Sequence, residues 1–403
     1  MLPDGWKSTT LGKIMDFRNG LNFSKSDSKN LIKVVGVSDF SLGNVLSRTD
    51  SLKETYVDQF KDDDLLKGND FLFVRSNGNK SLIGRCLYFP HIPEPISFSG
   101  FTIRGRLKNR SINASYIFQI IAGEYFRKHI NLSGSGTNIS NLSQEILSNT
   151  PLILPPLPEQ KKIAAILSTW DRAIEGTEKL LANSQQQKKA LMQQLLTGKK
   201  RLPGFTGEWK TVTIGSLLKE AKRPVEWKDD NFYKLLSVKR RSEGVILREV
   251  LHGTKILTKK MNYAKSGDFL ISKMQVVHGA SGLVPEHLDN HHISDSYIAL
   301  RAKNPEKFDI EFFSWLSKER VMYHKTFLCS YGVTIEKMTF NFNMYLKENI
   351  KIPPTVTEQR SISQLLNTTE NEITALESDL SRLRQEKKAL MQQLLTGKIR
   401  VAV

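Results

Sequence analysis

The chain contains little cysteine and no long apolar segment. Its 403 residues include two cysteines, Cys86 and Cys329, and we expect both to be buried and reduced. No uninterrupted apolar run is long enough to span a membrane, so we expect no membrane contact. The first ten residues, MLPDGWKSTT, lack the charged and apolar regions of a signal peptide, so we expect a cytoplasmic location.

Sequence motifs that carry catalytic chemistry are also missing. There is no phosphate-binding GxxxxGK[ST], no paired CxxC, no HExxH and no GxSxG. The segment SGSGTNIS lacks the third glycine of a dinucleotide loop. SNTPL and AKNPE lack the second proline and the aromatic residue of the adenine-methyltransferase motif. Adjacent histidines on a strand point to opposite faces, so His291 and His292 with Asp295 do not predict a metal site. We therefore expect no catalytic residue, no metal and no cofactor in this chain, which favours a binding subunit.

An internal repeat organises the chain. The twelve residues KKALMQQLLTGK occupy positions 188–199 and again 387–398, an offset of 199 residues. Glu159-Gln160 recurs as Glu358-Gln359 at the same offset, and each pair follows a proline-rich segment. The two stretches thus match in length and predict two equivalent long helices.

Apolar residues in both stretches recur at intervals of three and four, which predicts a heptad seam. The predicted seam comprises Ile163, Leu167, Trp170, Ile174, Leu181, Leu191, Leu195, Ile362, Leu366, Ile373, Leu376, Leu380, Leu383, Leu390 and Leu394. Five polar residues interrupt it and are expected to help set its register, namely Thr177, Ser184, Lys188, Thr369 and Lys387. The helices either pair with each other, the favoured arrangement, or pack separately against their own domains.

The helix ends carry recognisable signals. Thr355 and Glu358 have the spacing of a capping box, and Pro158 suits a first helical turn. Gly198 and Gly397 stand where a helix commonly ends in a left-handed residue. At 1.5 Å per residue, each helix would be about 60 Å long.

The segments before the helices resemble each other more faintly. KGNDFLFVRS, from Lys67, matches KSGDFLISKM, from Lys265, and both segments have the short alternating runs typical of strands. Each segment also predicts one helix, over residues 114–130 and 310–327. We predict a mixed α/β (α+β) fold: domain 1 (1–152), central helix (153–200), domain 2 (201–352) and C-terminal helix (353–403). The helices would form an antiparallel coiled coil in a pseudo-two-fold symmetric, fused dimer.

The positive charge is concentrated in the predicted domains. The net charge is +18. The two helical stretches contribute only about +5 of it, so most of the excess lies elsewhere in the chain. A basic excess of this size predicts a polyanionic partner, most commonly nucleic acid, bound by the domains.

Stretches that mix cations with amide and hydroxyl side chains are candidates for DNA contact, because these groups bind phosphates and base edges. In domain 1 the candidates are Arg75, Ser76, Asn77, Asn79, Lys80, Arg85, Arg104, Arg106, Ser135, Thr137 and Asn138. In domain 2 they are Lys239, Arg240, Arg241, Lys273, Gln275, His278, Tyr331, Thr334 and Lys337.

Taken in order, PPLPEQKKIAAIL, PPTVTEQRSISQLL, the repeated KKALMQQLLTGK and the strand motif GDFLIS resemble the specificity (S) subunits of type I restriction–modification systems. The resemblance covers essentially the whole chain. TIEKMTFNFN and SKMQVV in domain 2 depart from the usual family pattern, as expected if the two domains read unlike half-sites.

The resemblance implies two target recognition domains, each reading one half of a split double-stranded DNA target. The helices would set the gap and dock two methyltransferase subunits, which use S-adenosylmethionine to methylate adenine N6. Restriction (motor–nuclease) subunits, which use ATP and magnesium, would cleave unmethylated DNA. It also implies a bacterial or archaeal host.

Three other hypotheses fit parts of the sequence. A coiled-coil scaffold whose basic domains bind protein or RNA explains the repeat, but not the concentration of charge in the domains. A free-standing modification enzyme conflicts with the missing motifs. An S-like subunit of another restriction class would have fused nuclease–methylase partners.

Overall fold

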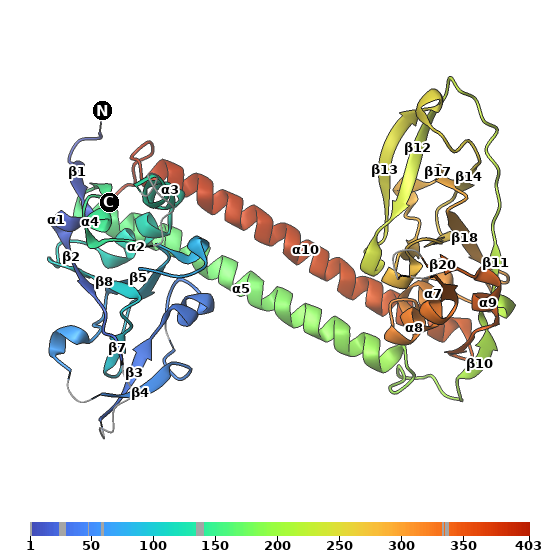
Figure 1. Cartoon of the computed structure of the whole chain (residues 1–403), viewed down its shortest axis with the longest axis horizontal. Helices are drawn as coiled ribbons and strands as arrows, with labels where there is room; N and C mark the ends of the chain where they lie inside the picture. The colour runs from blue at the N-terminus through green and yellow to red at the C-terminus, as the bar shows by residue number, and fades with distance from the viewer. Residues whose placement is uncertain are drawn as a thin grey trace. The chain divides into compact units, whose positions relative to one another are not determined.

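The structure is a computed structural model that describes residues 2–23, 30–46, 48–57, 60–133, 141–332, 334 and 338–403. The chain divides into two compact units, Met1–Thr177 with Asp379–Val403, and Glu178–Ser378. Each unit therefore contains one globular domain and a portion of both long helices (Figure 1). Within the described ranges, no helix combines the length and apolarity needed to cross a membrane.

The first domain is built on two small sheets. The order of the four-stranded sheet is β2-β8-β5-β6, and that of the three-stranded sheet is β4-β3-β7, with β3 and β7 parallel. A separate antiparallel pair, β1 and β9, joins the two ends of the domain. The strands are β1 (Lys7–Thr10), β2 (Met15–Asn19), β3 (Asn30–Val35), β4 (Lys53–Val57), β5 (Asp70–Val74), β6 (Cys86–Phe89), β7 (Ile96–Phe98), β8 (Thr102–Leu107) and β9 (Pro151–Leu154).

The helices of this domain are α1 (Leu11–Ile14), α2 (Ala114–Ala122), α3 (Glu124–Ser133) and α4 (Gln144–Ser148). The single helix predicted over residues 114–130 is wrong, because Gly123 is extended (φ −75°, ψ 158°) and separates α2 from α3. Every residue of β5 is buried, since this central strand is covered on both faces. Cys86 is free and buried, as expected.

Among the described residues, the second domain repeats the arrangement with a fourth strand in its second sheet and an additional short pair, β19 and β20. Its four-stranded sheets have the orders β11-β18-β15-β16 and β13-β12-β17-β14, and β10 pairs with β21 as β1 pairs with β9. The strands are β10 (Lys210–Thr213), β11 (Leu218–Glu220), β12 (Phe232–Val238), β13 (Val245–His252), β14 (Met261–Ala264), β15 (Phe269–Ser272), β16 (Ser281–Leu283), β17 (His291–Ser294), β18 (Tyr297–Ala302), β19 (Ser330–Tyr331), β20 (Thr339–Phe340) and β21 (Asn349–Ile352).

Helices α6 (Ile214–Leu217), α7 (Ile310–Leu316), α8 (Arg320–Leu328) and α9 (Phe342–Lys347) complete this domain. Here too the single helix predicted over residues 310–327 is wrong. The backbone becomes extended at Glu319 (ψ 147°), which lies between the end of α7 and the start of α8. Cys329 is free and buried.

The two long helices are α5 (Leu157–Leu195) and α10 (Val356–Leu394), each of 39 residues (Figure 1). They pair antiparallel. In the first unit Lys387 contacts Asp171, and in the second Lys188 contacts Glu370 while Ser184 donates to Glu372 at 3.1 Å. The Lys188 and Lys387 pairs are related by the 199-residue offset on both sides, so the pairing repeats the pseudo-two-fold pattern.

Every predicted seam residue is buried or half-buried. In the first unit Ile163, Leu167 and Leu394 belong to the domain core. In the second unit Leu195, Ile362 and Leu366 do the same, so the helix ends pack into domains while their middle portions pair. The two arrangements considered from the sequence therefore occur along the same helices.

Gly198 and Gly397 end the helices with left-handed backbones, at φ +70° and +73°. A Cβ atom at Gly198 would lie 3.1 Å from the Trp209 ring, and one at Gly397 would lie 2.6 Å from Pro3. Two features therefore require glycine at both positions: the left-handed backbone, and the close approach of a residue from the adjoining domain.

Candidate nucleic-acid interface

In the first domain, the loop that follows β5 is held by two other segments. The backbone N–H of Arg75 donates to the carbonyl of Phe101 at 2.8 Å, and its guanidinium donates to Gly100 at 3.4 Å. The carbonyl of Arg75 accepts from the N–H of Leu142 at 2.7 Å, and Ser76 forms an isolated bridge with Asn141. The loop thus begins from a fixed base.

The amides of this loop are engaged within it. Asn77 Oδ1 accepts from the N–H of Asn79 at 2.8 Å, and Asn79 Oδ1 accepts from the N–H of Ser81 at 3.0 Å. Lys80 and Arg85 are exposed. Their side chains make no hydrogen bond or ion pair within the described ranges, so both charges are available to an anionic partner.

Two of the predicted arginines point inward. Arg104 is 5% exposed, lies 5.7 Å from the centre of the Phe98 ring and donates to the Asp63 carbonyl at 2.6 Å. Burial lowers the pKa of this guanidinium. Arg106 binds both carboxylate oxygens of Asp70, at 2.8 and 2.7 Å. These two cations therefore tie together segments of the domain's own fold.

In the second domain, two of the predicted stretches meet. Lys239, Arg240 and Arg241 are exposed in the β12–β13 turn, where Arg241 has a left-handed backbone (φ +58°). Next to them, the N–H of Ser242 donates to the carbonyl of Gly279 at 2.8 Å. This bond brings the basic turn against the β15–β16 loop that carries Lys273, Gln275 and His278.

The β15–β16 loop is anchored much like its counterpart. The backbone N–H of Lys273 donates to the Ser296 carbonyl at 2.9 Å, and its ammonium donates to the Asp295 carbonyl at 2.6 Å. Gln275 Oε1 and His278 Nε2 are buried and have no hydrogen-bond partner among the described residues. These two atoms therefore contribute no hydrogen bond to the described part of the domain.

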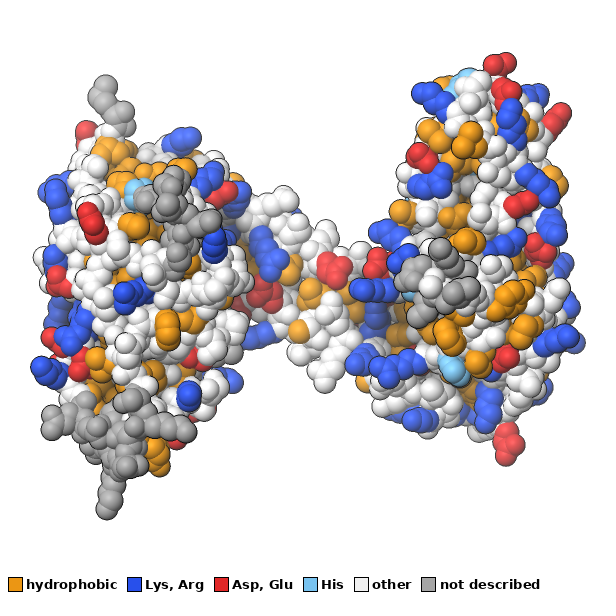
Figure 2. Space-filling view, viewed as in Figure 1, with side chains coloured by type: hydrophobic (Ala, Val, Ile, Leu, Met, Phe, Trp, Pro, Cys, Tyr) orange, Lys and Arg blue, Asp and Glu red, His pale blue; other side chains and the backbone are white. Residues whose placement is uncertain are grey.

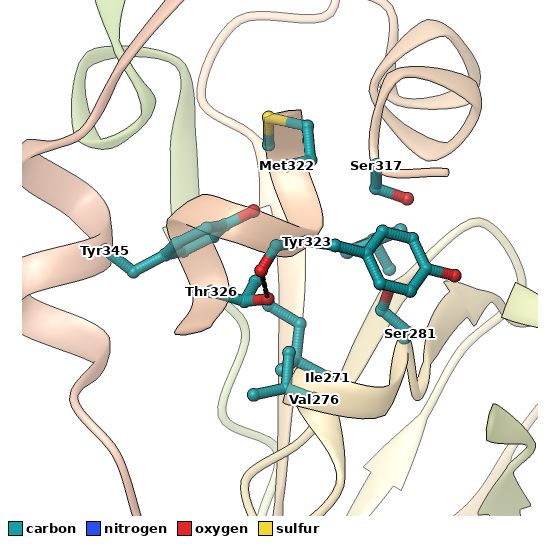
Figure 3. Close-up of a pocket in the computed structure, with 10 residues that line it drawn as sticks. Ile271, Val276, Ser281, Ser317, Met322, Tyr323, Thr326 and Tyr345 are labelled. Carbon is teal, nitrogen blue, oxygen red and sulfur yellow. Dashed lines mark hydrogen bonds between the residues drawn. The ribbon is translucent and has the colours of Figure 1, made fainter. Parts of the chain in front are cut away.

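A small cavity lies behind this loop, between α8 and the β15–β16 segment (Figure 3). Tyr323 Oη lies 2.7 Å from Ser242 Oγ, and a Cβ atom at Gly279 would lie 2.2 Å from that Tyr323 oxygen. The cavity measures about 10 Å³, which is room for at most one water. It is a packing defect beside the loop and does not fit a small-molecule ligand.

Two further candidates lie at the surface of the second domain. Tyr331 is 60% exposed at the end of β19, and Thr334 is exposed nearby. Four predicted residues lie outside the described residues, namely Ser135, Thr137, Asn138 and Lys337. Figure 2 shows Lys and Arg side chains scattered over the visible face of each domain, with acidic side chains among them.

Two apolar residues at these loops were not predicted. Phe101 is 60% exposed in the turn that holds Arg75, and Met274 is 48% exposed directly after Lys273. Nothing in their spacing singled them out, because an apolar residue in a strand-rich segment is ordinarily assigned to the core. The sequence signal for Phe101 was its place in the turn segment SFSGFT.

Each domain is fastened to the helices by equivalent contacts. In the first unit, buried Glu159 accepts from Arg400, and from Trp6 Nε1 at 3.3 Å. In the second unit, buried Glu358 accepts from Arg201 Nη2 at 2.6 Å. The neighbouring glutamines also match. Gln160 Oε1 accepts from the N–H of Asn113, and Gln359 Oε1 from that of Asp309, both at 2.9 Å.

Comparisons with known proteins agree with this architecture. Residues 3–183 match the family model of the type I restriction modification DNA specificity domain. A Methanocaldococcus jannaschii protein assigned the name type I restriction enzyme MjaX specificity subunit is 25% identical, over 99% of this chain and 95% of its own. The MjaVIII specificity subunit of the same organism is 26% identical over 73% of this chain and 72% of its own.

Solved structures show the same fold. The S subunit of a type I restriction–modification system from M. genitalium superposes with a TM-score of 0.61 at 11% identity, covering 97% of this chain and 96% of that one. The repeat, the two domains of like topology, the family-model match and the full-length relatives agree. Over nearly its whole length, the chain is similar to the specificity subunits of type I restriction–modification systems.

Proposed function

We propose that this chain is the sequence-specific DNA-binding subunit of a type I restriction–modification enzyme, with each domain reading one half of a bipartite DNA target. The observation that carries the proposal is that the two domains share a topology but differ in the side chains of their candidate DNA loops. Two domains of like topology are fastened to the helices by equivalent glutamate and glutamine contacts. Their loops, by contrast, present different side chains, as two unlike half-sites require.

Affinity would come from the exposed cations at these loops. Lys80 and Arg85 in the first domain, and Lys239 to Arg241 in the second, are exposed and suited to phosphates. Arg104 and Arg106 would support the first loop from within. The proposal therefore gives the inward-pointing arginines a positioning role, and the exposed loop residues the contacts with DNA.

The chemistry would be supplied by partners. Two methyltransferase subunits would bind S-adenosylmethionine and methylate adenine N6, and restriction subunits would use ATP and magnesium to cleave DNA. The long helices would dock these subunits, and their length would set the gap between the half-sites. Assembly on chromosomal DNA places the complex in the cytoplasm of a bacterium or archaeon.

Single-molecule sequencing of DNA from cells that co-express this chain with its neighbouring methyltransferase gene tests the proposal. We expect a split motif with methyladenine in both halves, present only when this chain is present. Cells given the methyltransferase alone are the control. A stable, purifiable complex that methylates no motif would contradict the proposal.

A salt titration adds an independent measurement. If phosphates are bound by several Lys and Arg side chains, affinity for duplex DNA should fall steeply as salt rises. Substituting Lys80 and Arg85 together by alanine should reduce the slope by about two. Affinity that does not respond to salt would contradict a DNA interface formed by these loops.

A further inference from the structure

Phe101 is an aromatic side chain that the fold holds in solvent. It occupies the turn between β7 and β8 and is 60% exposed. The turn does not depend on the ring. The hydroxyl of Ser99 accepts from the N–H of Phe101 at 3.2 Å, and the Ser99 carbonyl accepts from Thr102 N and Oγ1, at 2.8 and 2.6 Å. The core therefore gains little from an aromatic residue here.

The turn is also rigidly placed. The N–H of Gly100 donates to the Leu21 carbonyl at 2.7 Å, and a Cβ atom at Gly100 would lie 2.2 Å from Asn22 Oδ1. Phe101 is thus presented at a fixed position, as a side chain must be if it is to recognise a partner.

The surroundings of Phe101 are polar and cationic. Its carbonyl accepts from the N–H groups of Arg75 and Ser76, at 2.8 and 3.4 Å, and the Arg75 guanidinium donates to Gly100. The loop beyond Ser76 continues through Asn77 to the exposed Lys80. A single aromatic ring beside cations and amides suits a nucleic acid, because the ring can stack on a base while the cations bind phosphates.

We infer that Phe101 is an apolar wedge that stacks against the bases of the half-site read by the first domain, unstacking one base step. The inference rests on the proposed function and deepens it by naming a specificity-determining residue. The second domain has serine at the equivalent turn position, since Lys273 N–H donates to Ser296 as Arg75 N–H donates to Phe101. At the corresponding loop, the second domain instead exposes Met274, which follows Lys273. The two half-sites are therefore deformed differently.

The test uses the full chain purified with its methyltransferase subunit, and a duplex carrying the sequenced motif with 2-aminopurine at successive positions of the first half-site. The wild type should give a fluorescence rise at one position, because unstacking relieves quenching. Phe101→Ala should abolish the rise and weaken binding roughly tenfold or more. Phe101→Trp should retain both, since tryptophan also stacks.

Three controls separate the wedge from other roles. Tyr125→Ala removes an equally exposed ring (63%) from α3 and should leave affinity unchanged. Phe101→Ala should leave the salt dependence of binding unchanged, because no phosphate contact is lost. It should also leave the thermal midpoint unchanged, because the ring is not part of the core.

The outcomes distinguish this inference from the proposed function. If wild-type complex binds the motif and Phe101→Ala binds it within about twofold with the same fluorescence, the wedge is wrong and the function stands. If Phe101→Ala instead loses its methyltransferase subunit and keeps DNA affinity, the residue is a protein contact and the wedge is also wrong. If the wild type binds no specific duplex, the proposed function itself fails.

Discussion

The first and second domains are alike where they meet the long helices and unlike at their candidate DNA loops. Glu159 and Glu358 are both buried at the helix starts, and each accepts from an arginine placed at the same repeat position, Arg400 or Arg201. At the loops, Arg75 is replaced by Lys273, and Phe101 by Ser296. The framework is thus duplicated, while the surface that would read DNA has diverged.

The same contrast appears inside the domains. Buried Asp70 and Asp268 each follow a glycine or asparagine with a positive φ, and each accepts a backbone N–H three residues back. Asp70 binds one arginine, Arg106, whereas Asp268 binds two. A shared folding element is therefore stabilised to different extents in the two halves.

The largest effect is expected at these aspartates. Asp268→Ala leaves the guanidinium groups of Arg223 and Arg301 without the buried carboxylate that they share. We expect it to lower the free energy of unfolding of its unit by about 4 kcal/mol, and Asp70→Ala by about 3 kcal/mol. Amide hydrogen exchange at increasing urea concentrations, followed in peptides from each unit, measures both losses of unfolding free energy. A loss below about 1 kcal/mol at both sites would show that the pairs do not stabilise the fold.

A smaller effect is expected at the joints between domain and helix. Arg201 is 22% exposed and its partner Glu358 fully buried, whereas Arg400 is 46% exposed and Glu159 also accepts from Trp6. Arg201→Ala should therefore cost about 2 kcal/mol, and Arg400→Ala should cost clearly less. The same exchange experiment, read in peptides at the start of α10 and α5, measures them. The reverse order would overturn this comparison.

Within the helix pair, the two seam lysines should differ by less. Lys387 is 14% exposed and binds Asp171, which also accepts from Gln119 at 2.7 Å. Lys188 is 26% exposed and binds Glu370. Double-mutant cycles to alanine should give a coupling of about 1 kcal/mol for the first pair and about 0.5 kcal/mol for the second. Equal couplings would show that burial does not distinguish them.

The smallest effect is a difference in acid sensitivity. Burial lowers the pKa of His292, and its Nδ1 accepts from the N–H of Lys234 at 3.1 Å. The unfolded histidine binds a proton more readily than the folded one. The stability gained by keeping His292 neutral is therefore fully present above the ordinary pKa of 6.5 and is lost as pH falls below it. Between pH 8 and about pH 5.5 the second unit should lose less than about 1 kcal/mol on this account. His292→Phe should remove that loss, and an unchanged pH dependence would contradict this explanation.

The sequence predicted the helices better than the loops, for physical reasons. A heptad seam and a terminal glycine act over a few turns, so Leu167, Leu366 and Gly198 could be assigned from local pattern alone. Gly123 was misjudged because an amphipathic pattern continues through the break it makes. The extended backbone at Glu319, which interrupts the second predicted helix, was likewise not visible in the periodicity.

The candidate site was harder because it depends on distant partners. Arg104 and Arg106 have the composition of a DNA-binding stretch, yet Asp63, Asp70 and Phe98 engage them from other strands. Phe101 was overlooked because exposure of an aromatic residue is set by the turn that carries it. Charge and residue type thus selected the candidate loops, while the division between inward and outward side chains required the fold.

The central claim is that each domain reads its own half-site on a shared helical framework. The most direct test replaces residues 207–350 with the corresponding segment of a similar specificity subunit. Methylated DNA is then sequenced from cells that also express the methyltransferase subunit. We predict that one half of the methylated motif changes, while the other half and the gap between them stay the same. An unchanged motif, or one that changes in both halves, would contradict the account.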